Sequence, residues 1–305
     1  MSIRRLSFFI CVAFVAQGLP RADAQLSESF LWAASLHNAY RVQADIVYTT
    51  ANNYEAKLDL YLPRTTTPTP VVLYIHGGGW VAGSKEGSQL VLLPYLSLGW
   101  AVANVEYRLA KNSLAPAAVE DCRSALRWIY RHAGEYSFDT TKILITGHSA
   151  GGHLSLTTGM LRTSDGFDRP PEWLTVVPDV PVAAIINWYG ITDVADLLEG
   201  EHHQTYAEHW LGTQPNREEI ARKVSPMSYI RAGSPPIVSI HGDQDQLVPY
   251  SHAVRLHEAL TKANVPNRLI TVPGGKHGGF SAQEMERIFS EIVAFLQEQG
   301  FSFPK

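Results

Sequence analysis

The sequence predicts an α/β fold with a mostly parallel sheet, helices on both faces and lid insertions. Short β-branched runs recur from about residue 43 onward, and amphipathic stretches of about 10 to 20 residues separate the later ones. The chain has 305 residues, of which 45% are hydrophobic, enough to bury a large core in one domain. Continuously apolar strands are typical of a sheet that helices cover on both sides.

The expected strands and helices follow one another in a regular order. The expected strands are residues 44–50, 56–63, 70–77, 100–109, 142–147, 182–190, 235–242 and 267–273. The clearest helical patterns are residues 116–135, 251–265 and 281–299. Because no helix separates the first two strands, we expect them to form an antiparallel pair at one edge of the sheet.

Two stretches interrupt this order. Residues 162–181 and 195–232 are polar, aromatic and poorly periodic. Long excursions from a compact domain are usually functional lids or binding loops. Both stretches are therefore lid candidates.

Residues 1–24 have the pattern of a secretory signal peptide. A basic start, MSIRR, precedes the apolar run LSFFICVAFVAQGLP, and ADA before Gln25 fits the rule for cleavage between small residues. Cleavage after Ala24 would leave one domain, residues 25–305, as a secreted or periplasmic protein. The alternative is an uncleaved anchor, but the apolar run is shorter than the ~20 residues that a bilayer span needs. No stable membrane anchor is expected.

Charge and cysteine content restrict the partners. Removing residues 1–24 takes away three arginines and one aspartate, so the formal charge changes from −4 to −6, which argues against nucleic acid as a partner. Only Cys122 remains, so the mature chain is expected to have no internal disulfide. Cys122 lies in a helical pattern and is expected to be a small buried hydrophobe.

Ser149 is the candidate nucleophile. It is the serine of GHSAG, a G-x-S-x-G motif that directly follows an expected strand and precedes a helical stretch. This is the setting of a nucleophile elbow, a tight turn that lifts the hydroxyl above the sheet. Neither neighbouring histidine is well placed as its base: consecutive side chains such as that of His148 point in different directions at a sharp turn, and His153 lies one turn into the helix.

HGGGW, residues 76–80, supplies candidate oxyanion donors. The loop follows an expected strand, and its glycines let backbone N–H groups approach a ligand closely. We expect the N–H groups of Gly78, Gly79 and Ala150 to form the oxyanion hole. The alternative, a phosphate loop, is disfavoured because Ser84 and Lys85 stand in the wrong order for that motif.

The candidate acid and base come later in the chain, in the order that this architecture uses. HGDQDQLVP offers Asp243 and Asp245 at the end of an expected strand, and one of the two is expected to form the turn. GGKHGG presents His277 between two pairs of glycines, in a loop able to reach the serine. The alternative for His277 is a polar residue in a flexible loop.

Five motifs together carry a family resemblance: YIHGGGW, EYRLA with APAAVEDCRSALRW, GHSAGGHL, HGDQDQLVP and GGKHGG. They resemble the α/β-hydrolase carboxylesterases of the hormone-sensitive-lipase and bacterial feruloyl or acetylxylan esterase type, over about residues 43–298. The resemblance implies the α/β-hydrolase fold, with Asp245 as the acid and Asp243 at the structural turn position. It also implies an oxyanion loop at Gly78 and Gly79, and no metal or organic cofactor.

These observations predict a secreted serine carboxylesterase with a Ser149, Asp245 and His277 triad. The expected substrates are small acyl esters, acetyl or feruloyl, either free or linked to plant polysaccharide. Candidate pocket residues are Trp80, His148, Trp188 and Tyr189; core packing is an equal alternative for the last two.

Three alternatives remain. GHSAGGH and HGDQDQLVP also resemble prolyl-oligopeptidase catalytic domains, but only about twenty mature residues precede the first strand, too few for the propeller that those enzymes carry. A non-catalytic binding module on a hydrolase scaffold would be expected to have lost part of the triad. EHHQTYAEHW, residues 201–210, has histidines and glutamates, but their spacing fits no H-E-x-x-H metal site, so a solvated lid is preferred.

Overall fold

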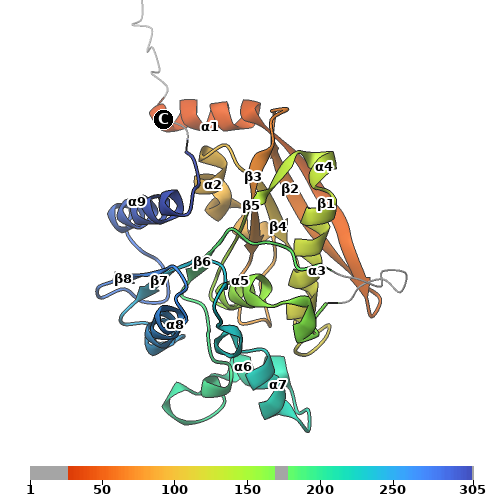
Figure 1. Cartoon of the computed structure of the whole chain (residues 1–305), viewed down its shortest axis with the longest axis vertical. Helices are drawn as coiled ribbons and strands as arrows, with labels where there is room; N and C mark the ends of the chain where they lie inside the picture. The colour runs from red at the N-terminus through yellow and green to blue at the C-terminus, as the bar shows by residue number, and fades with distance from the viewer. Residues whose placement is uncertain (1–26, 169–177, 304–305) are drawn as a thin grey trace, which may run out of the picture.

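An eight-stranded sheet forms the centre of the molecule (Figure 1). The structure is a computed structural model that describes residues 27–168 and 178–303. Within these residues the strand order is β1-β2-β4-β3-β5-β6-β7-β8. The strands are β1 (Tyr40–Ala51), β2 (Tyr54–Pro63), β3 (Thr69–Ile75), β4 (Ala101–Val105), β5 (Phe138–His148), β6 (Ala184–Trp188), β7 (Ile237–Gly242) and β8 (Asn267–Val272).

The sheet is mostly parallel, as the sequence predicts. β2 pairs antiparallel with both β1 and β4, and every other neighbouring pair is parallel. Each expected strand is present, and the first two form the expected antiparallel pair. Because β3 to β8 run in one direction, the loops after their carboxyl ends gather at one edge of the sheet, where open α/β sheets place their sites.

Helices cover both faces of the sheet (Figure 1). The α-helices are α1 (Glu28–Ala39), α2 (Leu93–Ser97), α3 (Ala117–Arg131), α4 (Ala133–Tyr136), α5 (Ala150–Met160), α6 (Thr205–Leu211), α7 (Arg217–Lys223), α8 (Ser251–Lys262) and α9 (Ala282–Glu298). The 3-10 helices are η1 (Glu86–Leu92), η2 (Thr163–Asp165), η3 (Ala195–Leu197), η4 (Gly200–His202) and η5 (Pro226–Tyr229). α2 and α9 pack on one face, and α3, α5 and α8 pack on the other.

The central strand β3 shows how the sequence builds two cores. Its side chains alternate between the faces: Val71, Leu73 and Ile75 join the core under α3 and α5, while Val72 and Tyr74 join the core under α2 and α9. All five are almost completely buried. Burying one such side chain stabilises the fold by about 1.5–3 kcal/mol, so a strand with two apolar faces belongs in the middle of the sheet.

Helix α1 was not among the expected helices. Its start is capped by Ser27, whose side chain accepts a hydrogen bond from the Phe30 N–H at 3.3 Å. None of its residues is buried. A helix that buries no face has no apolar periodicity to detect, which is why the sequence pattern missed it.

Both lid candidates are partly helical. Residues 195–232 contain η3, η4, α6, α7 and η5, and residues 162–181 contain η2, although part of that stretch, 169–177, lies outside the described residues. The predicted signal peptide, residues 1–24, also lies outside them. In the described part of the chain, no helix has both the length and the apolar character needed to cross a membrane.

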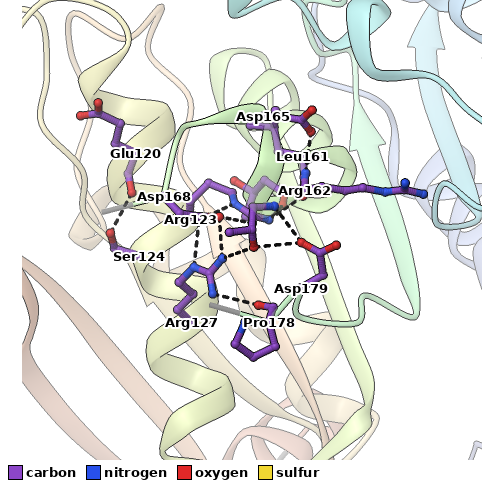
Figure 2. A network of polar contacts seen from close by, with 12 residues as sticks. Glu120, Arg123, Ser124, Arg127, Leu161, Arg162, Asp165, Asp168, Pro178 and Asp179 are labelled. Atoms are coloured by element: carbon purple, nitrogen blue, oxygen red, sulfur yellow. Dashed lines mark hydrogen bonds and ion pairs between the residues drawn. The ribbon is translucent and has the colours of Figure 1, made fainter. Parts of the chain in front are cut away.

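Ion pairs and a hydrogen bond hold the first lid candidate, residues 162–181, to α3. Figure 2 shows Asp168 between Arg123 and Arg127, and the arginine side chains donate to both carboxylate oxygens. Arg127 also donates to the Pro178 carbonyl oxygen at 3.0 Å. Removing one partner of such a buried pair leaves an uncompensated charge and typically costs about 3–5 kcal/mol. The network therefore fastens both residue 168 and residue 178 to the same helix.

Candidate active site

Ser149 occupies the sharp turn between β5 and α5. Its backbone has φ 56° and ψ −119°, a sparsely populated conformation that costs about 1–3 kcal/mol for a residue with a side chain. Two hydrogen bonds hold the turn: the Ser149 N–H donates to the Trp188 carbonyl at 2.9 Å, and the His153 N–H donates to the Ser149 carbonyl at 3.0 Å. The strained turn sets Ser149 at the end of the sheet, as expected for a nucleophile elbow.

The glycines on either side of Ser149 are required by packing. A Cβ atom on Gly147 would lie 2.3 Å from the Ile75 carbonyl oxygen, and one on Gly151 would lie 2.0 Å from the same atom. Both distances are far below van der Waals contact. The G-x-S-x-G spacing therefore lets the turn press against the end of β3, next to the HGGGW loop.

The two candidate acids, in the loop after β7, have different hydrogen-bond partners. The His277 Nδ1–H donates to Asp245 Oδ2 at 2.7 Å, and the N–H groups of Leu247 and Val248 donate to Asp245 Oδ1 at 2.8 and 3.0 Å. Asp243 instead accepts from the Gly274 N–H at 2.7 Å and so stabilises the turn after β8. The structure thus pairs Asp245, and not Asp243, with His277.

Electrostatics keep Asp245 ionised. Burial by itself raises the pKa of this carboxyl, but hydrogen bonds from His241, His277 and the Val248 N–H outweigh burial and hold its pKa well below the usual range. A carboxylate is only an acceptor, so the His277 proton lies on Nδ1 and Nε2 is left with a lone pair. A neutral imidazole in this tautomer can accept a proton from a serine hydroxyl.

Ser149 and His277 line the same pocket, which has a volume of about 430 Å³. The pocket residues come from six separate segments at the carboxyl edge of the sheet. They are Gly78, Gly79, His148, Ser149, Tyr189, Tyr206, Leu247 and His277.

The HGGGW loop presents free N–H groups at this pocket. Gly78 and Gly79 have φ of 117° and 59°, and a Cβ on Gly78 would lie 2.1 Å from the Ala82 carbonyl oxygen. The His76 Nδ1–H donates to the Gly77 carbonyl at 2.7 Å and fixes the start of the loop. Toward the described residues, neither the Gly78 nor the Gly79 N–H donates a hydrogen bond. Ala150 is the first residue of α5, so its N–H has no acceptor within the helix.

Two of the expected pocket residues lie behind the pocket wall. Trp80 and Trp188 are not among the lining residues and are 0% and 2% exposed. The Trp80 Nε1–H donates to His153 Nδ1 at 3.2 Å, and its ring stacks on Trp210 with centroids 4.1 Å apart. The positive φ of Trp80, 61°, accompanies this inward orientation. These side chains support the wall, whereas His148 and Tyr189 form part of it.

The two histidines near Ser149 are neutral and otherwise engaged. Burial, together with the nearby His277, lowers the pKa of His148 to about 4, and its Nδ1 shares a hydrogen bond of 2.8 Å with the Tyr74 hydroxyl. Burial lowers the pKa of His153 to about 3. His153 accepts from Trp80 at Nδ1 and donates from Nε2 to the Val224 carbonyl at 2.7 Å, so neither ring nitrogen is available.

Sequence reasoning missed three residues at this site: Tyr206, Leu247 and His241. Tyr206 packs its Cβ against Gly79 and donates its hydroxyl to the Leu247 carbonyl at 2.9 Å, so it joins the oxyanion loop to the acid loop. Tyr206 lay within a predicted lid but in no motif. His241 contacts Asp245, and its only signal was its place in HGDQDQLVP.

The fold is that of an α/β-hydrolase, with a serine at the strand-to-helix turn after β5. A model of the BD-FAE family matches residues 58–260. The chain belongs to this family of α/β-hydrolase esterases, and the resemblance seen in the sequence motifs is confirmed.

Two Mycobacterium tuberculosis proteins are similar in sequence. The probable carboxylic ester hydrolase LipM is 34% identical over 62% of this chain and 44% of its own length. Esterase LipC is 27% identical over 70% of this chain and 54% of its own length. The chain thus spans about half the length of these curated relatives.

Solved structures of esterases are similar in fold. Thermogutta terrifontis esterase 2 superposes with a TM-score of 0.71 at 29% identity, covering 88% of this chain and 97% of that one. A bifunctional GH43-CE protein of Bacteroides eggerthii gives a TM-score of 0.69 at 27% identity, covering 83% of this chain and 38% of that one. A truncated carbohydrate esterase from gut microbiota gives 0.68 at 25% identity, covering 86% and 98%.

Proposed function

We propose that this protein is a secreted serine carboxylesterase that hydrolyses small acyl esters, acetyl or feruloyl, through an acyl-enzyme. The observation that carries the proposal is the 2.7 Å hydrogen bond from His277 to Asp245 at a pocket that Ser149 also lines. Membership of an esterase family and the named relatives support the reaction class. Secretion rests on the pattern of residues 1–24 alone.

The reaction proceeds in two steps. His277 Nε2 takes the proton of Ser149 as its Oγ attacks the ester carbonyl carbon, and Asp245 stabilises the resulting imidazolium. The same histidine gives that proton to the leaving alcohol as the carbon–oxygen bond breaks. A water molecule then attacks the acyl-enzyme, His277 accepts its proton and returns it to Ser149, and the acid is released.

Charge develops on the carbonyl oxygen in both steps. The N–H groups of Gly78, Gly79 and Ala150 stabilise this oxyanion, and each donor of this kind lowers the barrier by about 2.7–4 kcal/mol. They need no reorganisation during the reaction, because the positive φ values that Gly78 and Gly79 adopt already set the directions of the loop N–H groups.

The pocket favours uncharged acyl groups. None of its lining side chains is Asp, Glu, Lys or Arg, and His148 is neutral at pH 7 because burial and His277 lower its pKa to about 4. An acidic or basic acyl group would find no counter-charge there. Tyr189 and Tyr206 offer aromatic surface suited to a feruloyl ring. The carbohydrate esterase among the structural relatives supports esters on polysaccharide as the larger substrate.

An ester panel tests the proposal. The mature protein is assayed with p-nitrophenyl acetate, methyl ferulate, acetylated xylan and a proline-containing peptide, beside its Ser149→Ala variant. We expect turnover of at least one ester by the wild type and none by the variant. Peptide cleavage without ester cleavage would favour a peptidase, and a wild type as inert as Ser149→Ala would favour a non-catalytic module.

A further inference from the structure

A second histidine contacts the carboxylate of Asp245. His241 lies near the end of β7, and its side chain is completely buried. Its Nε2 lies 3.2 Å from Asp245 Oδ2 and 2.9 Å from the Val248 carbonyl oxygen. Asp245 therefore lies between two imidazoles, those of His241 and His277.

The surroundings determine which nitrogen of His241 carries the proton. Both atoms that face Nε2 are acceptors, so Nε2 must carry the hydrogen. Nδ1 is buried and has no hydrogen-bond partner among the described residues. A proton on Nδ1 would bury a second, unpaired N–H, so the geometry places the imidazole proton on Nε2.

Few other polar groups face this histidine. The Tyr250 ring packs edge-on to it with centroids 5.8 Å apart, and the Tyr250 hydroxyl is engaged with Thr271 Oγ1 at 2.6 Å. Asp245 is thus the one carboxylate in contact with His241 within the described parts of the chain, and His277 lies on its far side.

Both carboxylate oxygens of Asp245 face hydrogen-bond donors. Oδ1 accepts from two backbone N–H groups, and Oδ2 faces the two imidazoles. His241 also reaches the carbonyl of Val248, the residue whose N–H binds Oδ1. His241 thus ties the carboxylate and the acid loop to the rigid end of β7.

We propose that His241 is a positioning residue, whose Nε2–H fixes Asp245 Oδ2 in the orientation that His277 needs. This inference rests on the proposed esterase mechanism. His241 does not touch the reacting atoms; it acts through Asp245. Without it, the carboxylate keeps its two backbone donors but loses the side-chain donor that sets the direction of Oδ2.

Two substitutions separate positioning from packing. His241→Met keeps an apolar side chain of similar length and removes the donor, whereas His241→Gln can place an amide N–H close to the original Nε2. His257 provides a matched control because it is another buried histidine, with Nδ1 bonded to Asn267 Oδ1 at 2.8 Å. Among the described residues, its Nε2 has no hydrogen-bond partner and no hydrogen bond or ion pair joins it to a proposed triad residue.

The test measures kcat and KM for the best ester of the panel, with thermal unfolding and the low-field proton resonance of the His277–Asp245 hydrogen bond. We expect His241→Met to lower kcat by at least about tenfold, equivalent to about 1.4 kcal/mol, with little change in KM. Its low-field resonance should broaden through faster exchange with water. His241→Gln should recover most of both losses, and His257→Met should lower the melting temperature alone.

Three outcomes would overturn the inference. One is a His241→Met protein that, like His257→Met, loses stability but keeps kcat and the resonance. If His241→Met does not fold, His241→Gln and His241→Asn are compared instead. The shorter asparagine amide cannot reach Oδ2, so equal kcat values for these two variants would contradict the positioning role of His241. A wild type without esterase activity would defeat the proposed function itself, which distinguishes that failure from the first two.

Discussion

Replacing Asp245 by asparagine should disable the enzyme through the tautomer of His277. The N–H groups of Leu247 and Val248 point at the Oδ1 position, so the amide oxygen must take that place. The amide NH₂ is then forced into the Oδ2 position, 2.7 Å from His277 Nδ1. There it donates to Nδ1, and the histidine proton moves to Nε2, where it blocks acceptance of the serine proton.

The expected loss is large because the wrong tautomer removes the base altogether. We expect kcat to fall by about 10³–10⁴-fold, or about 4–5.5 kcal/mol of barrier, with KM nearly unchanged. The matched control is Asp243→Asn in the same loop. Its amide oxygen can still accept from the Gly274 N–H, so kcat should change by less than about twofold and stability by about 1 kcal/mol at most.

Both variants are assayed with the same ester under steady-state conditions, and their melting temperatures are measured to exclude unfolding. The reverse ranking, with Asp243→Asn inactive and Asp245→Asn active, would refute the assignment of the acid. Equal losses in the two variants would show that the loop as a whole, and not one carboxylate, controls activity.

Two further predictions concern the pocket wall and acid stability. Tyr206→Phe removes the hydrogen bond to the Leu247 carbonyl, so KM should rise about fivefold with kcat nearly unchanged, and a lower kcat at constant KM would contradict a wall role. Burial lowers the folded-state pKa of His153 to about 3, below its unfolded value of about 6.5, so its stabilisation is present above pH 6.5 and is lost progressively toward pH 3. Urea titrations measure the free energy of unfolding at each pH. In this window, His153 should contribute a slope of about 1.4 kcal/mol per pH unit, and His153→Asn should reduce that slope. A slope that does not change in the variant would contradict a neutral buried imidazole.

The fold was accessible from the sequence because its signals are local. The run PVVLYI is apolar at every position, as a strand buried on both faces requires, and it forms the central strand β3. The glycines around Ser149 and after His76 could also be recognised in the sequence as structurally required. A Cβ atom would clash with a backbone atom at Gly77, Gly78, Gly147 and Gly151, and with the Tyr206 side chain at Gly79.

The details of the site depend on contacts that local patterns do not encode. From the residues alone, Asp243 and Asp245 are two carboxylates in one turn, and only the family resemblance distinguished them before the structure placed His277 beside Asp245. Trp80 follows the oxyanion glycines, but its positive φ accompanies a ring buried in the core. Tyr206 reaches the site across a lid with no motif.

Covalent labelling of Ser149 is the most direct test of the central claim. The reagent is paraoxon, an organophosphate that transfers its phosphoryl group to an activated serine. After inactivation with paraoxon, peptide mass mapping should find one phosphoryl group, on Ser149, in step with the loss of esterase activity, and none on Ser149→Ala. Labelling at another residue, or full activity in a protein labelled at Ser149, would contradict the proposed nucleophile.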